Sequence, residues 1–335
     1  MSMPSSASYW RRVWRHFKRN TLAVVGLWIA LTLILMAVLA DVLANDTPYY
    51  MVYQGKTFFP MLQSALDSLG IVTLPAELQQ VDFTQLPVER VIFPPIPYRP
   101  NRINLLVSFA EPSAGHWLGT DKLGRDVMAG VIHGARISLS IGFVAVGIAL
   151  GIGLTLGALA GYFGGWVDLV ISRLFELLLA VPTFFLLITI AATLRPNIFY
   201  TMTVIGFTSW VGIARFTRNE FLRVRNLDYV IAAVALGTPT QRIVVRHILP
   251  NALAPVLVSV VLGIAAAILT ESGLSFLGIG VPADLVTWGS LLNEARSNSF
   301  AWWLAVFPGA AIFLAVVAYY LVGEGLRDAL DPRLQ

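Results

Sequence analysis

The chain has 335 residues, of which 57% are hydrophobic and only 13% are charged. Because a soluble domain has roughly 25% charged residues, this composition excludes a large soluble core and a disordered chain and indicates a membrane protein. The net charge is +4, and no basic stripe with interleaved aromatic residues is present, so nucleic acid is not an expected partner. The chain has no cysteine, which excludes disulfides, thiolate metal sites and cysteine nucleophiles.

Six apolar runs are each about 20 residues long, the length needed to cross a bilayer. They cover residues 21–43, 137–161, 169–194, 198–215, 252–274 and 301–322. The expected fold class is therefore an all-α membrane protein with six transmembrane helices. In this interpretation residues 137–323 form a core of five helices, and residues 324–335 form a cytoplasmic tail.

Residues 1–20 form a basic segment in front of the first run. A signal peptide has an apolar core of about 7 to 15 residues, so the longer run at 21–43 indicates a retained anchor helix. The positive-inside rule places the basic segment, and the arginine-rich stretch from Arg215 to Arg246, in the cytoplasm. An even number of spans then puts both termini on the cytoplasmic side. The positive side chains of the segment are Arg11, Arg12, Arg15, Lys18 and Arg19.

Residues 44–136 are expected outside the membrane, as an extended loop between the first two helices. The part up to residue 115 contains many prolines and no sustained period, so the sequence predicts a small external cap or an ordered loop. Its aromatic residues are expected to pack into a miniature core in preference to contacting an external partner. They are Tyr49, Tyr50, Tyr53, Phe58 and Phe59.

A dense turn at residues 116–126 carries charges of both signs immediately before the second run. Either Thr120 or Asp121 is expected to cap the helix that follows, with Arg125 and Asp126 holding the turn. We interpret the turn as structural. The alternative is contact with an external carrier of substrate, because binding residues favour loops.

Glycines in the second run recur at intervals of four residues. Gly147 and Gly151 form one pair, and Gly153, Gly157 and Gly161 form a longer series. Small residues at this spacing let two membrane helices approach closely, since lipid provides no hydrophobic force for their association. Both sets therefore predict close helix contacts.

Ionisable residues inside the apolar runs are few. Arg173 and Glu176 stand three residues apart and predict an internal ion pair that anchors the third helix, in preference to a proton relay. Glu271 follows Pro250 by about 20 residues, or about 30 Å of helix, so it is expected near the outer interface. There its carboxylate is expected to bond a nearby backbone turn, and the alternative is a role in the substrate path or as a gate.

The segment from residue 228 to residue 251 predicts two short helices, an elbow within a cytoplasmic loop at about 216–250. Gly237 suits the left-handed position that closes the first helix, and Pro239 suits the first position of the second. Thr238 and Gln241 have the spacing of a capping box, in which each side chain bonds a free backbone N–H of the turn. Pro250 is expected to end the second helix. The alternative is that these residues only form the turns that any linker between two membrane spans needs.

Motifs for catalysis are missing from the sequence. The four histidines lack the spacing of a metal site, and no phosphate-binding loop of the G-x-x-x-x-G-K-[ST] type is present. We therefore expect a chain that is not an enzyme and that holds no metal or cofactor of its own. A stand-alone secondary transporter is the alternative class, but such proteins use broken helices and midplane charges, which the runs lack apart from Arg173 and Glu176.

Several segments together resemble the membrane-spanning permeases of type I ATP-binding-cassette importers, in the dipeptide, oligopeptide and nickel branch. The elbow is similar to the family's cytoplasmic E-A-A-x3-G-x9-I-x-L-P loop. Residues 118–126, 161–165, 246–251 and 273–278 also match this branch. The resemblance covers the chain from about residue 115 onward and the first anchor helix. It implies the type I permease fold and a coupling loop that comprises Ile231, Ala232, Ala233, Gly237, Thr238, Ile248, Leu249 and Pro250.

Two positions depart from the family's loop. Ile231 stands where the family has a glutamate, and His247 stands where it has an isoleucine. The resemblance therefore does not imply, for this chain, the charged contact that the family's glutamate makes, unless another residue replaces it. Asp228 and the neighbouring arginines are the candidates.

The resemblance implies a division of labour. This chain and a second, homologous permease would form the pathway through the prokaryotic cytoplasmic (inner) membrane, among its lipids. Two cytoplasmic ATPases would bind ATP and Mg and drive transport through the coupling loop, and an external substrate-binding protein would deliver the substrate. The long external segment resembles a subgroup that includes peptide and microcin uptake permeases. Di- and oligopeptides are therefore the expected substrates, with nickel and oligosaccharides as alternatives.

Overall fold

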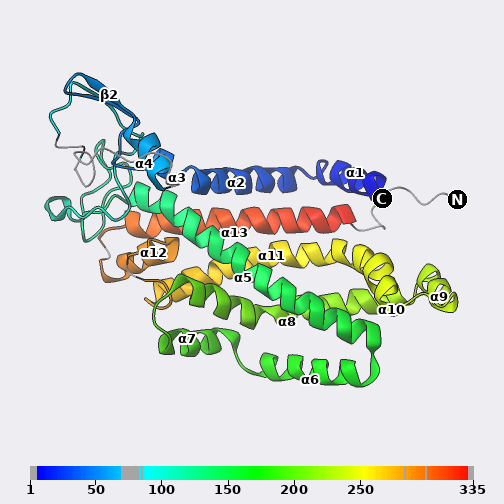
Figure 1. Ribbon diagram of the computed structural model, residues 1–335. Coiled ribbons are helices and arrows are strands. Elements are labelled where there is room, and N and C mark those ends of the chain that lie inside the picture. The colour runs from blue at the N-terminus through cyan, green and yellow to red at the C-terminus, as the bar shows by residue number, and fades with distance from the viewer. Residues whose placement is uncertain (1–5, 69–82, 84–85, 283, 299, 331–335) are drawn as a thin grey trace. The chain divides into compact units, whose positions relative to one another are not determined.

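The computed structural model describes the whole chain except residues 1–5, 69–82, 84–85, 283, 299 and 331–335. Helices dominate the described residues (Figure 1). The chain forms two compact units. The helical unit comprises residues 1–32, 138–282 and 312–335, and the cap unit comprises residues 33–137 and 283–311.

Long apolar helices match most of the predicted spans. Within the described residues, four helical stretches are long and apolar enough to cross a membrane. They are α2 (Thr21–Val38), α5 (Val127–Phe163), the continuous stretch Thr240–Phe276 and α13 (Trp303–Leu330). The shorter helix α1 (Ser6–Phe17) precedes α2.

The third predicted span is bent and not straight. It consists of α6 (Gly165–Ala180) and α7 (Thr183–Thr193), which meet at an angle of 79°. The cause is Pro182, because the residue before a proline is disfavoured in the helical region, and Val181 is extended at φ −96° and ψ 125°. The expectation of unbroken spans is therefore wrong at this position.

The ion pair predicted on this span is present, but its side chains lie on the protein surface and not in the interior. Arg173 pairs with Glu176 three residues later, and their side chains are 68% and 61% exposed. The pair joins two residues of α6 and lies on the surface of this helix.

The remaining helices of the helical unit follow in close sequence. α8 (Ile198–Arg225) leads to α9 (Asp228–Ala235), α10 (Thr240–Arg242), the π-helix η3 (Ile243–Ile248) and α11 (Leu249–Phe276). α8 is not among the stretches that qualify as spans, because threonine, serine and arginine residues lower its mean hydropathy. With the bent pair counted as one span there are five candidates in the described residues, so the count of six stays a prediction.

Glycines of α5 bring it into contact with α8. A Cβ atom at Gly153 would lie 2.9 Å from the Trp210 carbonyl oxygen, and one at Gly161 would lie 2.6 Å from the Phe221 Cβ. These separations are too short for any side chain, so the predicted close approach is confirmed for this series. At Gly147 and Gly151 no atom of the described residues lies within 4 Å of an added Cβ, so no helix of this chain packs closely there.

The cap unit contains a small antiparallel sheet. β1 (Tyr50–Tyr53) lies between β2 (Lys56–Phe58) and β3 (Arg90–Ile92). Met51 faces Phe58 on one side and Val91 on the other, and it is fully buried. The other elements of the unit are α3 (Ala40–Leu43), α4 (Pro60–Ser68), η2 (Leu105–Val107) and α12 (Trp288–Ser297).

The predicted miniature core forms around Met51. Tyr53 and Phe58 pack against it, together with Phe83 and Phe93. Tyr50 and Phe59 make an edge-on ring contact 5.7 Å apart, and Phe59 remains 48% exposed. Packing therefore accounts for most of these aromatic residues, as expected from their apolar area.

The turn at residues 116–126 is a buried polar structure, as predicted, but its cap is a different residue. Asp126 accepts a hydrogen bond from the Ala129 N–H (2.8 Å) and so caps α5 in place of Thr120 or Asp121. Asp121 instead accepts from the backbone N–H of Arg125 (2.9 Å) and from its side chain. Arg125 also pairs with Glu294 of α12 at 2.6 Å. The turn is thus tied to α12 by an arginine whose side chain is 13% exposed.

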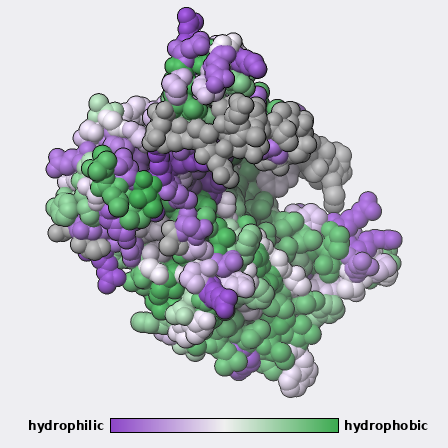
Figure 2. All heavy atoms as spheres, turned by 60° about the vertical axis from the view of Figure 1, so that its left-hand side comes forward, coloured by the Kyte–Doolittle hydropathy of each residue, from purple (hydrophilic) through white to green (hydrophobic). Residues whose placement is uncertain are grey.

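The spanning helices carry large apolar side chains on their surface. Trp28 is 66% exposed, Phe185 68% and Phe313 64%, and the space-filling view shows broad hydrophobic areas (Figure 2). A soluble monomer seldom exposes so much apolar area. These surfaces are suited to lipid or to other membrane subunits.

Candidate functional site

The first helix of the elbow, α9, ends in a Schellman motif at Gly237. Its φ is +74°, and a side chain built there would meet nothing within 4 Å. The Gly237 N–H donates to the Val234 carbonyl (2.9 Å), and the Thr238 N–H donates to the Ala233 carbonyl (3.1 Å). The predicted left-handed conformation is confirmed. Glycine is required here by the backbone and not by lack of space.

The predicted capping box is wrong. α10 begins at Thr240, and Pro239 occupies the N-cap position in an extended conformation without a side-chain cap. Because the helix begins one residue later than predicted, Thr238 lies outside the N-cap, and its hydroxyl cannot serve the first turn. The turn is closed by the backbone, with the Arg242 N–H donating to the Pro239 carbonyl at 2.9 Å.

The predicted helix end at Pro250 is also wrong. Residues Thr240–Phe276 form one continuous helical stretch, and Pro250 lies in the first turn of α11. A proline lacks the N–H that an α-helix needs, and its ring clashes with the carbonyl four residues earlier. The wider π-turn of η3 removes this conflict, because the Leu249 N–H bonds the Val244 carbonyl five residues back. The elbow is therefore continuous with a spanning helix.

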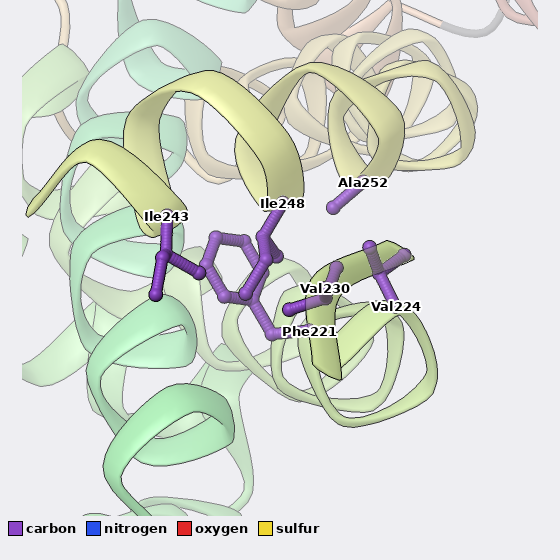
Figure 3. Packing of buried hydrophobic residues seen from close by; sticks show 6 residues of the cluster. All are labelled: Phe221, Val224, Val230, Ile243, Ile248 and Ala252. Carbon is purple, nitrogen blue, oxygen red and sulfur yellow. The ribbon is translucent and has the colours of Figure 1, made fainter. Parts of the chain in front are cut away.

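A buried core holds the elbow on the end of α8 (Figure 3). Its six side chains come from α8, α9, η3 and α11, and each is at most 2% exposed. Full burial of an aliphatic or aromatic side chain stabilises by roughly 1.5–3 kcal/mol. The elbow is thus packed as a solid body and is not a flexible linker. The core consists of Phe221, Val224, Val230, Ile243, Ile248 and Ala252.

Hydrogen bonds add a second link between α9 and the start of α11. The Asn251 side-chain amide donates to the His247 carbonyl (2.7 Å) and to the Tyr229 hydroxyl (3.1 Å). The Tyr229 hydroxyl lies 3.4 Å from the same carbonyl. Burial raises the pKa of Tyr229, and the nearby Arg223 partly opposes this shift. Asn251 therefore joins the His247 carbonyl to the Tyr229 hydroxyl of α9.

Other apolar side chains of the elbow are exposed. Leu236 is 85% exposed, Val245 56%, Val234 55% and Ile231 54%. We call these four residues the elbow tip. Exposed apolar side chains on a rigid element are typical of a protein interaction site.

An open hollow with two positive charges adjoins the elbow tip. It is lined by Pro239, Gln241, Arg242, Val245 and Arg246. Within the described residues neither Arg242 nor Arg246 forms an ion pair. The hollow and the elbow tip together present an apolar surface with free positive charge, which fits a partner with apolar and acidic groups.

The residues predicted for the coupling loop divide into two groups. Ala233 and Ile248 are buried and belong to the packing of the elbow. The exposed ones are Ile231, Ala232, Gly237 and Pro250, with Thr238 and Leu249 partly buried.

The exposed apolar residues Val234, Leu236 and Val245 were not among the residues predicted for the coupling loop. α9 is apolar from Val230 onward, so its sequence shows no difference between Val230, which is buried, and Ile231, which is not. The sequence feature that could have indicated an exposed apolar surface was an apolar helix too short to span a membrane.

Glu271 is fully buried in α11. Its carboxylate accepts hydrogen bonds from the Ser275 hydroxyl (2.7 Å) and from the Ser138 hydroxyl of α5 (3.2 Å). Serine hydroxyls of two helices thus bond the buried carboxylate. Glu271 links α11 to α5 through these bonds. In the described part of the chain, no three histidine, aspartate or glutamate side chains gather as a metal site would require.

Known proteins resemble this chain over most of its length. Residues 153–335 match the family described as binding-protein-dependent transport system inner membrane component, and residues 8–63 match the N-terminal TM domain of oligopeptide transport permease C. The chain is 36% identical to the dipeptide transport system permease protein DppC of Alkalihalophilus pseudofirmus, over 99% of this chain and 92% of the relative. It is 33% identical to the oligopeptide transport system permease protein OppC of Bacillus subtilis, over 98% and 92%.

A third relative is the inner membrane ABC transporter permease protein YejE of Escherichia coli, which is 34% identical over 95% of this chain and 96% of its own length. These matches confirm both the resemblance drawn from the motifs and the fold class, an all-α membrane protein with the permease fold of ABC importers. The chain belongs to the family of binding-protein-dependent transport system inner membrane components.

Proposed function

We propose that this chain is a permease subunit of an ATP-driven importer of di- and oligopeptides. A homologous second permease would complete the pathway, and an external binding protein would deliver the peptide. The relatives' names, which describe dipeptide and oligopeptide transport, support the substrate class. The basic side chains of α1 and of residues 215–246 support a cytoplasmic position for the termini and the elbow.

The elbow tip and its hollow are the surface that we assign to a cytoplasmic ATPase. One observation carries this assignment: an exposed apolar surface sits on an elbow that is itself tightly packed. The buried side chains, from Phe221 to Ala252, keep the elbow in one conformation. The exposed side chains, such as Leu236 at 85%, have no packing function in the chain itself.

The continuity of α10, η3 and α11 explains how force would pass into the membrane. A partner that moves the elbow moves a helical stretch that extends from Thr240 to Phe276. Glu271 and Ser138 connect the far part of this stretch to α5. ATP and Mg would bind to the partner subunits, and this chain would contribute no catalytic residue.

Ile231 stands where the family's loop has a glutamate, so this elbow would contact the ATPase through different side chains from those of the family's loop. The Ile231 side chain is 54% exposed and gives apolar contact area where the family's loop has a carboxylate. Arg242 and Arg246 line the adjoining hollow, so they are the charged contacts that we assign to this elbow. The matching groove of the ATPase is then expected to carry acidic side chains.

Reconstitution with the partner subunits tests the proposal. Proteoliposomes that contain both permeases, the ATPases and the binding protein should accumulate a labelled di- or oligopeptide when ATP is supplied inside. Vesicles with this chain alone should not. Peptide accumulation by the chain alone would contradict the proposal, as would ATP-driven uptake of nickel or of an oligosaccharide without uptake of peptide.

A further inference from the structure

The N-terminal helix α1 has one buried edge that attaches it to the helical unit. Val13 and Phe17 are 3% and 4% exposed, and they pack with Ala23 of α2 and Ala329 of α13. Asn20 then caps α2 by accepting from the Ala23 N–H at 3.1 Å. α1 is thus held next to the first residues of a spanning helix and cannot move freely away from it.

The rest of α1 and the link to α2 are strongly basic. The segment from residue 6 to residue 20 contains no acidic residue. Five of its side chains are positive and exposed, and none of them forms an ion pair within the described residues. The carboxylates near the end of α13 have other partners, since Glu324 pairs with Arg327 and Asp328 accepts from Asn20. The five positive residues are Arg11, Arg12, Arg15, Lys18 and Arg19.

Two tryptophans lie among these charges. Trp10 is 46% exposed and Trp14 is 49% exposed. Trp14 stacks on Phe17 with ring centroids 5.6 Å apart, and the Lys18 ammonium group lies 5.2 Å from its ring centre. Half-exposed indoles among arginine and lysine residues are typical of a helix in the boundary between lipid tails and headgroups.

We propose that α1 lies in the membrane interface and binds the headgroups of anionic phospholipids. The position of α1 supports lipid as the partner, because only three residues separate its end from the start of the span α2. Figure 1 shows α1 at the same end of the helical unit as α9 and α10. Unpaired cations at that boundary attract an anionic leaflet, and the indoles give them an apolar anchor. This inference depends on α2 crossing the membrane and not on the transport of peptides.

Lipid-specific quenching of tryptophan fluorescence tests the proposal on the full chain. The protein is placed in vesicles of equimolar phosphatidylcholine and phosphatidylglycerol, with bromine on one lipid at a time. We expect stronger quenching when phosphatidylglycerol is brominated. The chain has nine tryptophans, so the signal of α1 is the part that is lost in the double variant Trp10→Phe, Trp14→Phe.

Charge variants give the matched comparison. In the triple variant Arg11→Gln, Arg12→Gln, Arg15→Gln, the preference for phosphatidylglycerol should fall on the order of 100-fold, since each basic residue near an anionic surface contributes roughly fivefold. The triple variant with lysine at the same positions keeps the charge and should keep the preference. High salt should also weaken it.

Three outcomes would overturn the proposal. Equal quenching by both lipids in the unaltered chain would show that α1 has no preference for anionic lipid. A preference that persists in the glutamine variant would place the lipid site elsewhere. Cross-links from α1 to an ATPase in the assembled transporter, together with no lipid preference in the chain alone, would make the basic surface a protein contact.

Discussion

Replacement of Gly237 by valine should uncouple ATP hydrolysis from peptide transport. The residue has a φ of +74°, a conformation that costs an ordinary L-residue roughly 1–2 kcal/mol and a β-branched one more. Since nothing lies within 4 Å of the added Cβ atom, the whole effect comes from backbone strain. A strain of 1–2 kcal/mol changes the ratio between the native elbow and distorted forms by a factor of about 5–30.

The assay is the amount of peptide imported per ATP hydrolysed in proteoliposomes. Gly237→Val should lower this ratio, while Gly237→Asn should keep most of it, because asparagine tolerates the left-handed region. Gly212→Ala is the matched control. It also has nothing within 4 Å but lies inside α8 with no positive φ, so the alanine is expected to be harmless or slightly stabilising. Normal coupling in Gly237→Val would refute the role given to the Schellman motif.

Three further predictions concern the packing of the chain. Gly161→Ala should destabilise the chain by about 1–3 kcal/mol, because its Cβ would lie 2.6 Å from the Phe221 Cβ. Gly151→Ala, which has open space around its Cβ, should not destabilise it. Thermal unfolding in detergent measures both variants, and equal unfolding midpoints would contradict the α5–α8 contact. Arg125→Gln should cost about 3–5 kcal/mol by leaving buried Asp121 and Glu294 without their arginine. Burial raises the pKa of Glu294, and the charge of Asp121 adds to this shift. Protonation of Glu294 at acidic pH should therefore reduce the stability loss of Arg125→Gln. A stability loss that grows as the pH falls would contradict this prediction. Glu271→Gln should retain its serine partners and unfold near the normal temperature, while Glu271→Leu should remove the acceptor of the two serine hydrogen bonds and lose about 1–3 kcal/mol. Equal stability of the two variants would show that these bonds matter little.

Local backbone rules predicted some features of the elbow and failed at others. The left-handed turn at Gly237 follows from one residue, because only glycine adopts that φ without strain. The capping box required the helix to begin at a particular residue, and the extended Pro239 moved that start by one position. Pro250 suggested a helix end, but the π-turn before it allowed the helix to continue.

Features that depend on neighbouring helices could not be predicted from the sequence. Val230 and Ile231 are adjacent and equally apolar, yet one lies in the core against α8 and the other is exposed. The environment of Glu271 depends on Ser138, which is 133 residues away in the chain. The bend at Pro182 was predictable in principle, since proline disfavours helix at the preceding residue, but hydropathy alone merged α6 and α7 into one run.

A cysteine cross-link at the elbow tip tests the central claim most directly. The chain has no native cysteine, so Leu236→Cys introduces a single reactive thiol at a side chain that is 85% exposed, and Leu106→Cys, at 96% exposure in the cap unit, is the matched control. In the assembled transporter Leu236→Cys should cross-link to an ATPase subunit, and Leu106→Cys should not. Failure of Leu236→Cys to cross-link in an assembly that transports peptide, or an equal yield from both positions, would contradict the docking of an ATPase at the elbow.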